Sequence, residues 1–177
     1  DTRERWERRY ADAPATARPP SRFLLAHLPR FRGCALDVAC GAGRNAIALA
    51  RHGLRVEAID LAQQGLRMGQ AIARRERLPI HFVQADLQRM PLPLRRYDVV
   101  VVIRYLHREL FAALIDALRP GGYLLVETFL TDQAALGHPK NPAFLLARGE
   151  ILALTQGLAV VDHQEGELIE DGESAFL

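Results

Sequence analysis

Long hydrophobic runs and cysteines are scarce in this sequence of 177 residues. No uninterrupted stretch of about 18 apolar residues occurs, so we expect no membrane span and no membrane partner. The segment 1–6 is charged and lacks the apolar core that signal peptides carry. Cys34 and Cys40 are too few for a disulfide framework. Together these absences predict a cytoplasmic protein whose thiols stay reduced.

An excess of charge is also missing, because the formal net charge is only +2. A balance this close to neutral argues against nucleic acid as the main partner. Eight arginines fall within the first 32 residues, but Asp1, Glu4, Glu7 and Asp12 are interspersed among them. This mixture is typical of a solvated helix face, and a basic arm that attracts RNA or an anionic substrate is the alternative.

The residue patterns of metal sites and serine nucleophiles are absent too. The six histidines are scattered, no two of them lie at the helical spacing of metal ligands, and there is no C-x-x-C pair. We therefore expect no metal site. Ser21 and Ser174 are the only serines, and both lie outside the glycine-rich turn of the chain, which argues against a serine nucleophile.

What the sequence does contain is an alternation of short apolar strands with helices. Strands are expected at 34–39, 55–60, 80–84, 97–103 and, after a turn at 120–122, at 123–129; helices are expected at 2–11, 22–29, 62–77, 106–118, 150–156 and between the glycine turn and Gly53. Four successive valines, Val99–Val102, indicate a strand that is buried on both faces. The alternation predicts an α/β fold, a Rossmann-like, doubly wound and mostly parallel sheet with helices on both faces.

This alternation stops after the fifth expected strand. Residues 130–148 contain Gly137, Pro139 and Pro142 and are expected to form a long irregular loop. Strands at 158–161 and 173–177 are expected to pair as a C-terminal antiparallel hairpin, with the last strand truncated.

The glycine-rich turn follows the first expected strand. Gly41-Ala42-Gly43-Arg44-Asn45-Ala46 fits G-x-G-x-x-A, in which a dinucleotide pyrophosphate lies on a helix N-terminus. The span from Asp37 to Gly43 also fits a second pattern, an acidic residue followed by G-x-G. A carboxylate here would repel a pyrophosphate, whereas it suits a ligand with an ammonium group and a sulfonium. Asp37 therefore favours the second pattern.

Two further carboxylates follow the next two expected strands. Asp60 ends the second strand, where it can accept hydrogen bonds from both ribose hydroxyls. Asp86 follows the third strand and can accept the adenine amino proton, while Leu87 packs on the ring. Each acid taken singly is as well explained as a helix or turn cap. Three acids at three successive strand ends instead favour a nucleoside site.

These motifs resemble those of the class I S-adenosylmethionine-dependent methyltransferases, over residues 20–177. The segments that correspond to the family motifs are Leu36–Gly43, Val56–Asp60, Gln84–Leu87, Tyr97–Val102 and Leu118–Val126. Within the family, the small tellurite-resistance-type methyltransferases are most similar, through Trp6-x-x-x-Tyr10, Gly43-Arg44-Asn45 and Asn141-Pro142-x-Phe144-Leu145-Leu146. Ala39 stands where many members have the first glycine of the loop, and we expect it to be tolerated at a negative φ.

The resemblance implies S-adenosylmethionine as the cofactor and S-adenosylhomocysteine as its product. The implied cofactor contacts are Asp37, Ala39, Gly41, Gly43, Arg44, Asn45, Asp60, Leu61, Asp86, Leu87 and Ile103. Trp6, Arg9 or Tyr10 is expected to close over the cofactor. One domain is expected over 1–177, with an N-terminal arm or lid at 1–32, a cofactor-binding core at 33–129, a substrate-side loop and helix at 130–157, and C-terminal strands at 158–177.

Methyl transfer requires alignment, exclusion of water and, for some nucleophiles, a base. The acceptor should lie over the carboxyl ends of the fourth and fifth strands. There His107 is a candidate base, Arg104 and Arg108 are candidates to hold an anion, and Tyr105 is a candidate wall of the methyl pocket.

Each of these candidates has a structural alternative. His107 could cap the next helix or bind a loop carbonyl, the two arginines could pair with Glu109 or Glu127, and Tyr105 could fill the core. His138 and Asn141, in the long loop, are candidate lid residues, although loop histidines are often merely solvated.

The leading hypothesis is therefore a methyltransferase for a small nucleophile, either an anion or a thiol or chalcogen. A methyltransferase for RNA or protein, an NAD(P)-dependent oxidoreductase and a non-catalytic cofactor-binding module are the alternatives. After the fourth strand the chain reads Ile103-Arg104-Tyr105-Leu106, which lacks the Asn/Asp-Pro-Pro-aromatic run of enzymes that methylate base nitrogens. The sequence makes no prediction of oligomeric state.

Overall fold

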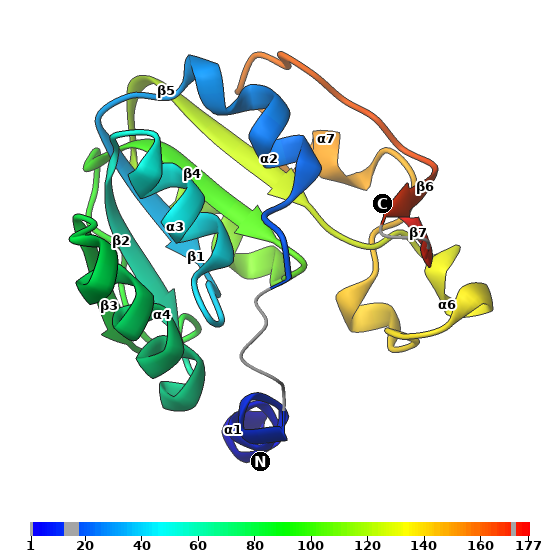
Figure 1. Cartoon of the computed structure of the whole chain (residues 1–177). Coiled ribbons are helices and arrows are strands. Elements are labelled where there is room, and N and C mark those ends of the chain that lie inside the picture. The colour runs from blue at the N-terminus through cyan, green and yellow to red at the C-terminus, as the bar shows by residue number, and fades with distance from the viewer. Residues whose placement is uncertain (1, 13–17, 171–172) are drawn as a thin grey trace.

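The computed structural model describes residues 2–12, 18–170 and 173–177 of the chain. Its centre is a five-stranded sheet in the order β3-β2-β1-β4-β5 (Figure 1). The strands are β1 (Cys34–Val38), β2 (Arg55–Asp60), β3 (Ile80–Gln84), β4 (Tyr97–Ile103) and β5 (Leu118–Glu127). All neighbouring strands in this sheet are parallel. The predicted α/β fold with a parallel sheet is confirmed.

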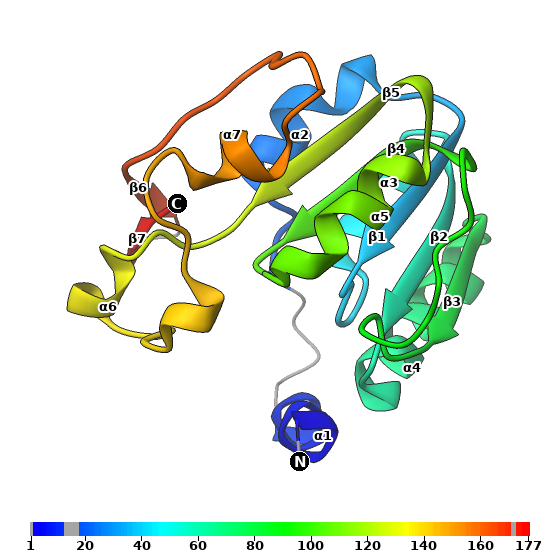
Figure 2. The ribbon, with the colours of Figure 1, turned by 180° about the vertical axis from the view of Figure 1, so that it is seen from behind.

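Helices cover both faces of this sheet, as predicted. The helices are α1 (Thr2–Asp12), α2 (Arg22–His27), α3 (Arg44–Arg51), α4 (Gln63–Glu76), α5 (Phe111–Asp116), α6 (Gln133–Leu136) and α7 (Glu150–Leu154), and the 3-10 turns are η1 (Leu28–Arg30), η2 (Arg108–Leu110) and η3 (Pro142–Phe144). Helices α2, α3 and α4 lie on the face seen in Figure 1, and α5 lies on the face seen in Figure 2. Helix α1 lies beyond the carboxyl ends of the strands in both views.

Alternate residues of the strands build the two halves of the core. On one face Val99 and Val101 of β4 share a cluster with Leu49 of α3. On the other face Val100 and Val102 share a cluster with residues of α5. Successive side chains of a strand point to opposite faces. The run of valines is therefore buried on both sides, as its composition predicted.

The fifth strand begins earlier than the sequence predicted. Residues 120–122, expected to form a turn before the strand, lie within β5. Tyr97 pairs with Leu118 and Val99 pairs with Tyr123, so residues 119–122 form an irregularity in the ladder. Gly121 has a φ of +79°, which suits such an irregularity. The helix expected at 106–118 is likewise shorter, because η2 precedes α5.

The C-terminal hairpin exists, but the sequence analysis placed one of its strands wrongly. β6 (Glu167–Glu170) pairs antiparallel with β7 (Glu173–Phe176). The expected partner, 158–161, forms no strand, and Val160 and Val161 are 62% and 57% exposed. β-branched residues favour a strand only where a neighbour supplies packing and hydrogen bonds. No described strand pairs with this segment.

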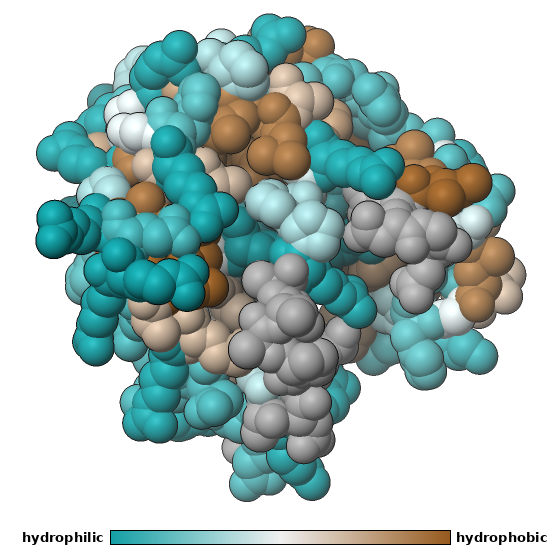
Figure 3. All heavy atoms as spheres, in the orientation of Figure 1, coloured by the Kyte–Doolittle hydropathy of each residue, from teal (hydrophilic) through white to brown (hydrophobic). Residues whose placement is uncertain are grey.

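Within residues 2–12, 18–170 and 173–177, no helix is long and apolar enough to cross a membrane. Figure 3 shows one face of the molecule as mostly hydrophilic, with apolar side chains gathered over α2. Leu25 of this helix is 44% exposed.

A buried polar junction joins several elements at the carboxyl end of the sheet. The Ser21 hydroxyl accepts a hydrogen bond from the Leu24 amide and so caps the N-terminus of α2. The same hydroxyl donates to Glu127 Oε2 at 2.8 Å, and the Ser21 amide donates to Asn45 Oδ1 at 3.0 Å. Ser21 and Glu127 are 2% and 7% exposed. The junction fastens α2 to the start of α3 and to the end of β5.

We predict that Ser21→Ala lowers the free energy of unfolding by about 2–3 kcal/mol, because it removes a helix cap and one partner of a buried carboxylate. Urea unfolding followed by circular dichroism measures this change. Ser174→Ala is the matched control, since Ser174 is exposed, and it should stay within about 0.5 kcal/mol of the parent protein. Equal effects of the two substitutions would contradict the assigned role of the junction.

Candidate active site

The glycine turn between β1 and α3 uses left-handed backbone at three residues. The φ angle is +54° at Ala39, +58° at Gly41 and +77° at Gly43. A Cβ at Gly41 would lie 2.1 Å from Tyr10 Oη, and one at Gly43 would lie 2.9 Å from the Phe82 ring. Glycine is therefore required at both positions, for its backbone conformation and because an aromatic ring lies against it.

Ala39 does not have the negative φ that the sequence analysis expected, so that expectation is wrong. The surrounding hydrogen bonds explain the difference. Cys40 N donates to Ile59 O, and Gly43 N donates to Cys40 O, each at 2.9 Å. These bonds determine the path of the loop, and residue 39 adopts the left-handed conformation although its Cβ makes this costly by about 1–2 kcal/mol.

Ala39→Gly is accordingly expected to raise the free energy of unfolding by about 0.5–1 kcal/mol, since the relief of strain exceeds the entropy that glycine adds to the unfolded chain. Urea unfolding tests this expectation. The matched control is Ala35→Gly, in the buried middle of β1, which should lower the free energy of unfolding by about 1 kcal/mol. A loss of stability in Ala39→Gly would show that residue 39 is not strained.

Asp37 lies beneath the glycine turn. Its side chain is 1% exposed, and its Oδ2 accepts a hydrogen bond from the Ala46 amide at 2.9 Å. Burial raises the pKa of Asp37 to about 7; the Ala46 amide opposes this shift and the charge of Asp60 adds to it. The carboxyl group thus holds the first turn of α3 against the end of β1, and its charge acts on the site from below the loop.

Asp60 fastens the end of β2 to the same turn. Its Oδ2 accepts a hydrogen bond from Gly41 N at 2.7 Å, and its Oδ1 accepts one from Ala62 N at 2.8 Å. Burial raises the pKa of this carboxyl group, while the hydrogen bonds from Ala62, Gly41 and Leu61 lower it. The carboxylate that the sequence assigned to a ribose therefore also determines the shape of the loop.

Asp86 and Leu87 follow β3 at the next strand end. The Asp86 carboxylate accepts a hydrogen bond from Gln88 N at 3.0 Å, which is the turn cap named as its structural alternative. Its side chain is nevertheless 41% exposed, so the group remains accessible to a ligand. Leu87 is buried, and Leu61 beyond β2 is half-buried.

Tyr105 stands near two of these acids. Burial raises the pKa of the Tyr105 phenol to about 12, and the charges of Asp86 and Asp60 add to this shift. Charges of the same sign act in this way only from nearby. Because the strands are parallel, the carboxyl ends of β1, β2, β3 and β4 lie along one edge of the sheet, which carries Asp37, Asp60, Asp86 and Tyr105. Ile103, the last residue of β4, lies two positions before Tyr105 and is buried.

Arg104 is held in place by the end of β5. It has a φ of +58°, its Nε lies 3.3 Å from Glu127 Oε1, and its guanidinium lies 4.5 Å from the centre of the Phe129 ring. The pairing with Glu127 is the one proposed as its structural alternative. Arg44 donates to Pro19 O at 2.7 Å. Burial lowers the pKa of Arg44, and the charge of Arg104 acts in the same direction, so the two arginines lie near one another.

His107 and Arg108 make different contacts. His107 Nδ1 lies 3.3 Å from Glu109 Oε2, and these side chains are 25% and 81% exposed. Arg108 binds both carboxylate oxygens of Glu150 and the Leu145 carbonyl. Arg108 thus joins α7 and its preceding loop to η2, the turn that follows β4, through a partner that was not among those predicted.

The candidate lid residues separate into two groups. His138 is exposed, and Asn141 Oδ1 accepts a hydrogen bond from Ala143 N at 3.0 Å, which caps η3. The rings of Trp6 and Tyr10 in α1 are 6.4 Å apart, and Tyr10 lies against Gly41 in the glycine turn. The side chain of Arg9 lies outside the described part of the chain.

Sequence reasoning missed one residue at this site. Glu7 of α1 accepts hydrogen bonds from Gln63 N at 2.8 Å and from Gln64 N at 2.9 Å. A signal for it exists in the sequence, because α4 begins after Ala62, which has no side-chain oxygen to cap a helix. The absence of a local cap indicates that a polar group from elsewhere meets these amides.

Comparison with known proteins agrees with this geometry. The family described as "Methyltransferase domain" matches residues 35–122. An uncharacterized methyltransferase of Mycobacterium tuberculosis is 37% identical over 120 residues, which are 65% of this chain and 60% of the relative. The chain thus spans less than two thirds of the length of this relative.

Residues 35–122 of the chain belong to the methyltransferase-domain family, and the fold is the Rossmann-like fold of the S-adenosylmethionine-dependent methyltransferases. An S-adenosylmethionine-dependent methyltransferase from Mesorhizobium loti has 28% identity and a TM-score of 0.57, over 63% of this chain and 54% of that one. TehB from Haemophilus influenzae has a TM-score of 0.74 at 19% identity, over 94% of this chain and 60% of that one. The likeness to TehB concerns the fold, and the predicted tellurite-resistance subfamily stays a prediction.

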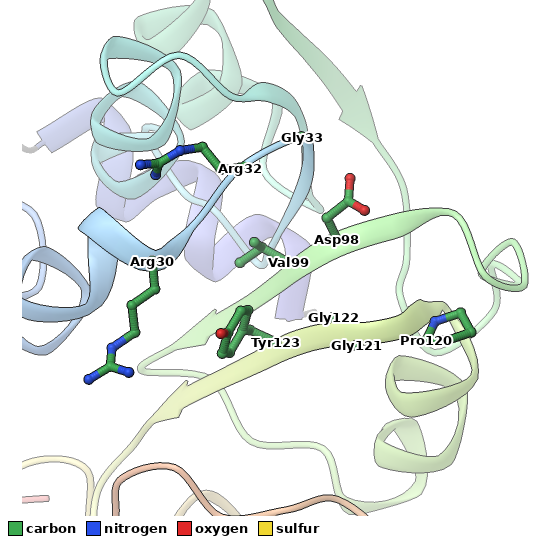
Figure 4. Close-up of a pocket in the computed structure, with 9 residues that line it drawn as sticks. All are labelled: Arg30, Arg32, Gly33, Asp98, Val99, Pro120, Gly121, Gly122 and Tyr123. Atoms are coloured by element: carbon green, nitrogen blue, oxygen red, sulfur yellow. The ribbon is translucent and has the colours of Figure 1, made fainter.

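Two cavities in the described part of the chain lie outside the glycine turn. One of about 290 Å³ lies where β1, β4 and β5 begin, between Gly33, Asp98 and Gly121 (Figure 4). Figure 4 shows Arg30 and Arg32 pointing away from Asp98, so they do not converge on one ligand position. The second, of about 520 Å³, follows β5 as far as Glu127 and Thr128, and residues 157–165 also line it.

Proposed function

We propose that the chain transfers a methyl group from S-adenosylmethionine to a small-molecule nucleophile and releases S-adenosylhomocysteine. The observation that carries this proposal is the cluster of carboxylates at the ends of β1, β2 and β3 around a turn with three left-handed residues. Acidic groups suit a cofactor with an ammonium group and a sulfonium, and they disfavour the pyrophosphate of a dinucleotide.

The residues present fit this cofactor. The turn has no Cβ atoms at Gly41 and Gly43, where Tyr10 and Phe82 lie against its backbone, so the fit to the cofactor rests on the carboxylates around the turn. We assign the ribose to Asp60, the adenine to Asp86 with Leu61 and Leu87 against the ring, and the methionine part to the loop near Ala39 and Ile103. This part of the site is supported by side chains that bind backbone groups. Asp37 accepts a hydrogen bond from the Ala46 amide, Arg44 donates one to the Pro19 carbonyl, and Asn45 accepts one from the Ser21 amide.

When bound, S-adenosylmethionine supplies a methyl group that its sulfonium already activates. The protein then has to bind the acceptor, exclude water and, where the nucleophile carries a proton, remove it. We assign Tyr105 as a wall of the methyl pocket because burial and two carboxylates keep its phenol protonated. We assign His107 as the base for a hydroxyl or thiol acceptor, with Glu109 orienting its ring.

The charge at the ends of β4 and β5 supports a small anionic acceptor. Arg104 is paired with Glu127, yet Arg44 adds a second positive charge nearby. A guanidinium that stacks on Phe129 is fixed in position, and a planar guanidinium matches the geometry of an oxyanion. We assign three further residues to the walls of the acceptor site: Arg108, His138 and Asn141.

The proposal predicts that S-adenosylmethionine and S-adenosylhomocysteine stabilise the protein, whereas NAD and NADP do not. A ligand at about 100 times its dissociation constant adds about 2.7 kcal/mol to the free energy of unfolding, a shift that a thermal melt resolves. Stabilisation by NAD or NADP alone, or by none of the four compounds, would overturn the proposal.

Asp60→Asn is expected to weaken S-adenosylhomocysteine binding by about tenfold to a hundredfold, since it removes a charged acceptor from the ribose. Isothermal titration calorimetry measures the affinity. Asp98→Asn is the matched control, because Asp98 also accepts a backbone hydrogen bond, from Cys34 N, but at the opposite end of the sheet. A comparable loss of affinity in both variants would show that the effect comes from lost stability, and it would contradict the assignment of Asp60 to the ribose.

A further inference from the structure

Helix α1 contacts the core at the N-terminus of α4. The Glu7 carboxylate uses both oxygens there, Oε1 for Gln63 N at 2.8 Å and Oε2 for Gln64 N at 2.9 Å. Asp60 takes the preceding amide, that of Ala62. Three successive amides at the start of α4 are thus bound by two carboxylates, one from β2 and one from α1.

Among the residues that the structure describes, no other side chain caps these amides. Ala62 occupies the N-cap position in an extended conformation, and its methyl group cannot accept a hydrogen bond. The first N–H groups of a helix require acceptors from outside the helix and carry the positive end of its dipole. A carboxylate that accepts from two of them is held more firmly than one paired with a flexible side chain on the surface.

A second contact confirms where α1 lies. Tyr10, one turn after Glu7, places its ring over two glycines of the site. A Cβ at Gly41 would lie 2.1 Å from Tyr10 Oη, and a Cβ at Gly65 would lie 3.2 Å from Tyr10 Cδ2 and 3.0 Å from the backbone of Gly41. A Cβ at Gly41 would overlap Tyr10 in this place, and a Cβ at Gly65 would crowd both the Tyr10 ring and the Gly41 backbone. The contact of Glu7 with α4 therefore brings an aromatic residue onto the glycine turn.

We infer that Glu7 is a positioning residue, whose carboxylate fastens α1 to the start of α4 and so holds Tyr10 and Trp6 over the cofactor edge of the sheet. The inference rests on the proposed function for the identity of the cofactor, but the fastening itself does not. The two hydrogen bonds of Glu7 thus act as a latch that holds α1 at the cofactor site.

The charges around Glu7 keep the latch ionised at neutral pH. The hydrogen bonds from Gln64 and Gln63, and the positive charges of Arg3 and Arg67, lower the pKa of Glu7 despite the opposing effect of burial. The negative charge of Asp60, beside it, is compensated by the helix N-terminus that both carboxylates share.

Trp6 makes the latch measurable without any ligand, because it is the only tryptophan of the chain and lies in α1. Glu7→Gln replaces one acceptor by an amide donor, so we expect α1 to be released and acrylamide to quench Trp6 fluorescence more strongly. We expect the same variant to bind S-adenosylhomocysteine about three- to thirtyfold more weakly in calorimetry. Glu4→Gln, which removes the same charge from the same helix, should change neither quantity.

Two further variants separate the latch from a general effect on α4. Gln63→Pro removes one donor at the first helical position, where proline is well tolerated, and should reproduce part of the Glu7→Gln effect without adding to it in the double variant. Ala62→Ser in the Glu7→Gln background returns a cap to α4 but nothing that holds α1. We expect it to leave both Trp6 quenching and the weakened affinity unchanged.

Three results would overturn the inference. Unchanged Trp6 quenching in Glu7→Gln would show that Glu7 does not fasten α1. Increased quenching with unchanged S-adenosylhomocysteine affinity would show that α1 does not act on the cofactor site, and rescue of affinity by Ala62→Ser would assign the effect to α4 alone. If the parent protein binds no S-adenosylhomocysteine, the proposed function fails, and Trp6 quenching still decides whether the latch exists.

Discussion

The hydrogen bond from Gly41 N to Asp60 Oδ2, 2.7 Å long, is the contact on which the rest of the site depends. It joins the end of β2 to the turn that follows β1, and thereby determines where the backbone of that turn lies. The other oxygen of Asp60 accepts a hydrogen bond from the Ala62 amide at the start of α4. The next amide of α4, that of Gln63, binds Glu7 of α1. One buried carboxylate thus connects the ends of β1 and β2 to the start of α4, where α1 also binds.

Much of this arrangement was predictable because it follows from local patterns. The valines of β4, the glycines at 41 and 43, and the acids at the strand ends predicted a parallel sheet and its functional edge. The same residues of the sheet lie in the segment 35–122 that matches the methyltransferase-domain family.

The remaining features depend on contacts between residues that are far apart in the chain, and such contacts cannot be predicted from local patterns in a single sequence. Residues 158–161 have the composition of a strand but no described strand pairs with them. The φ of Ala39 is imposed by hydrogen bonds of its neighbours. Arg108 binds Glu150, 42 residues away, rather than an acid next to it. Glu7 was missed because its partners are backbone amides, which leave no mark in the sequence except the missing cap at Ala62.

The burial of Asp37 couples the site to the proton concentration. A carboxyl group with a pKa of about 7 is divided between its neutral and ionised forms near neutrality, while in the unfolded chain it is ionised from about pH 4 upward. Its neutral form therefore favours the folded state at low pH, and this contribution is lost as the pH rises toward 7. A cation that binds above the loop favours the ionised form. Binding of a positively charged ligand and release of a proton from beneath the loop are then one linked equilibrium.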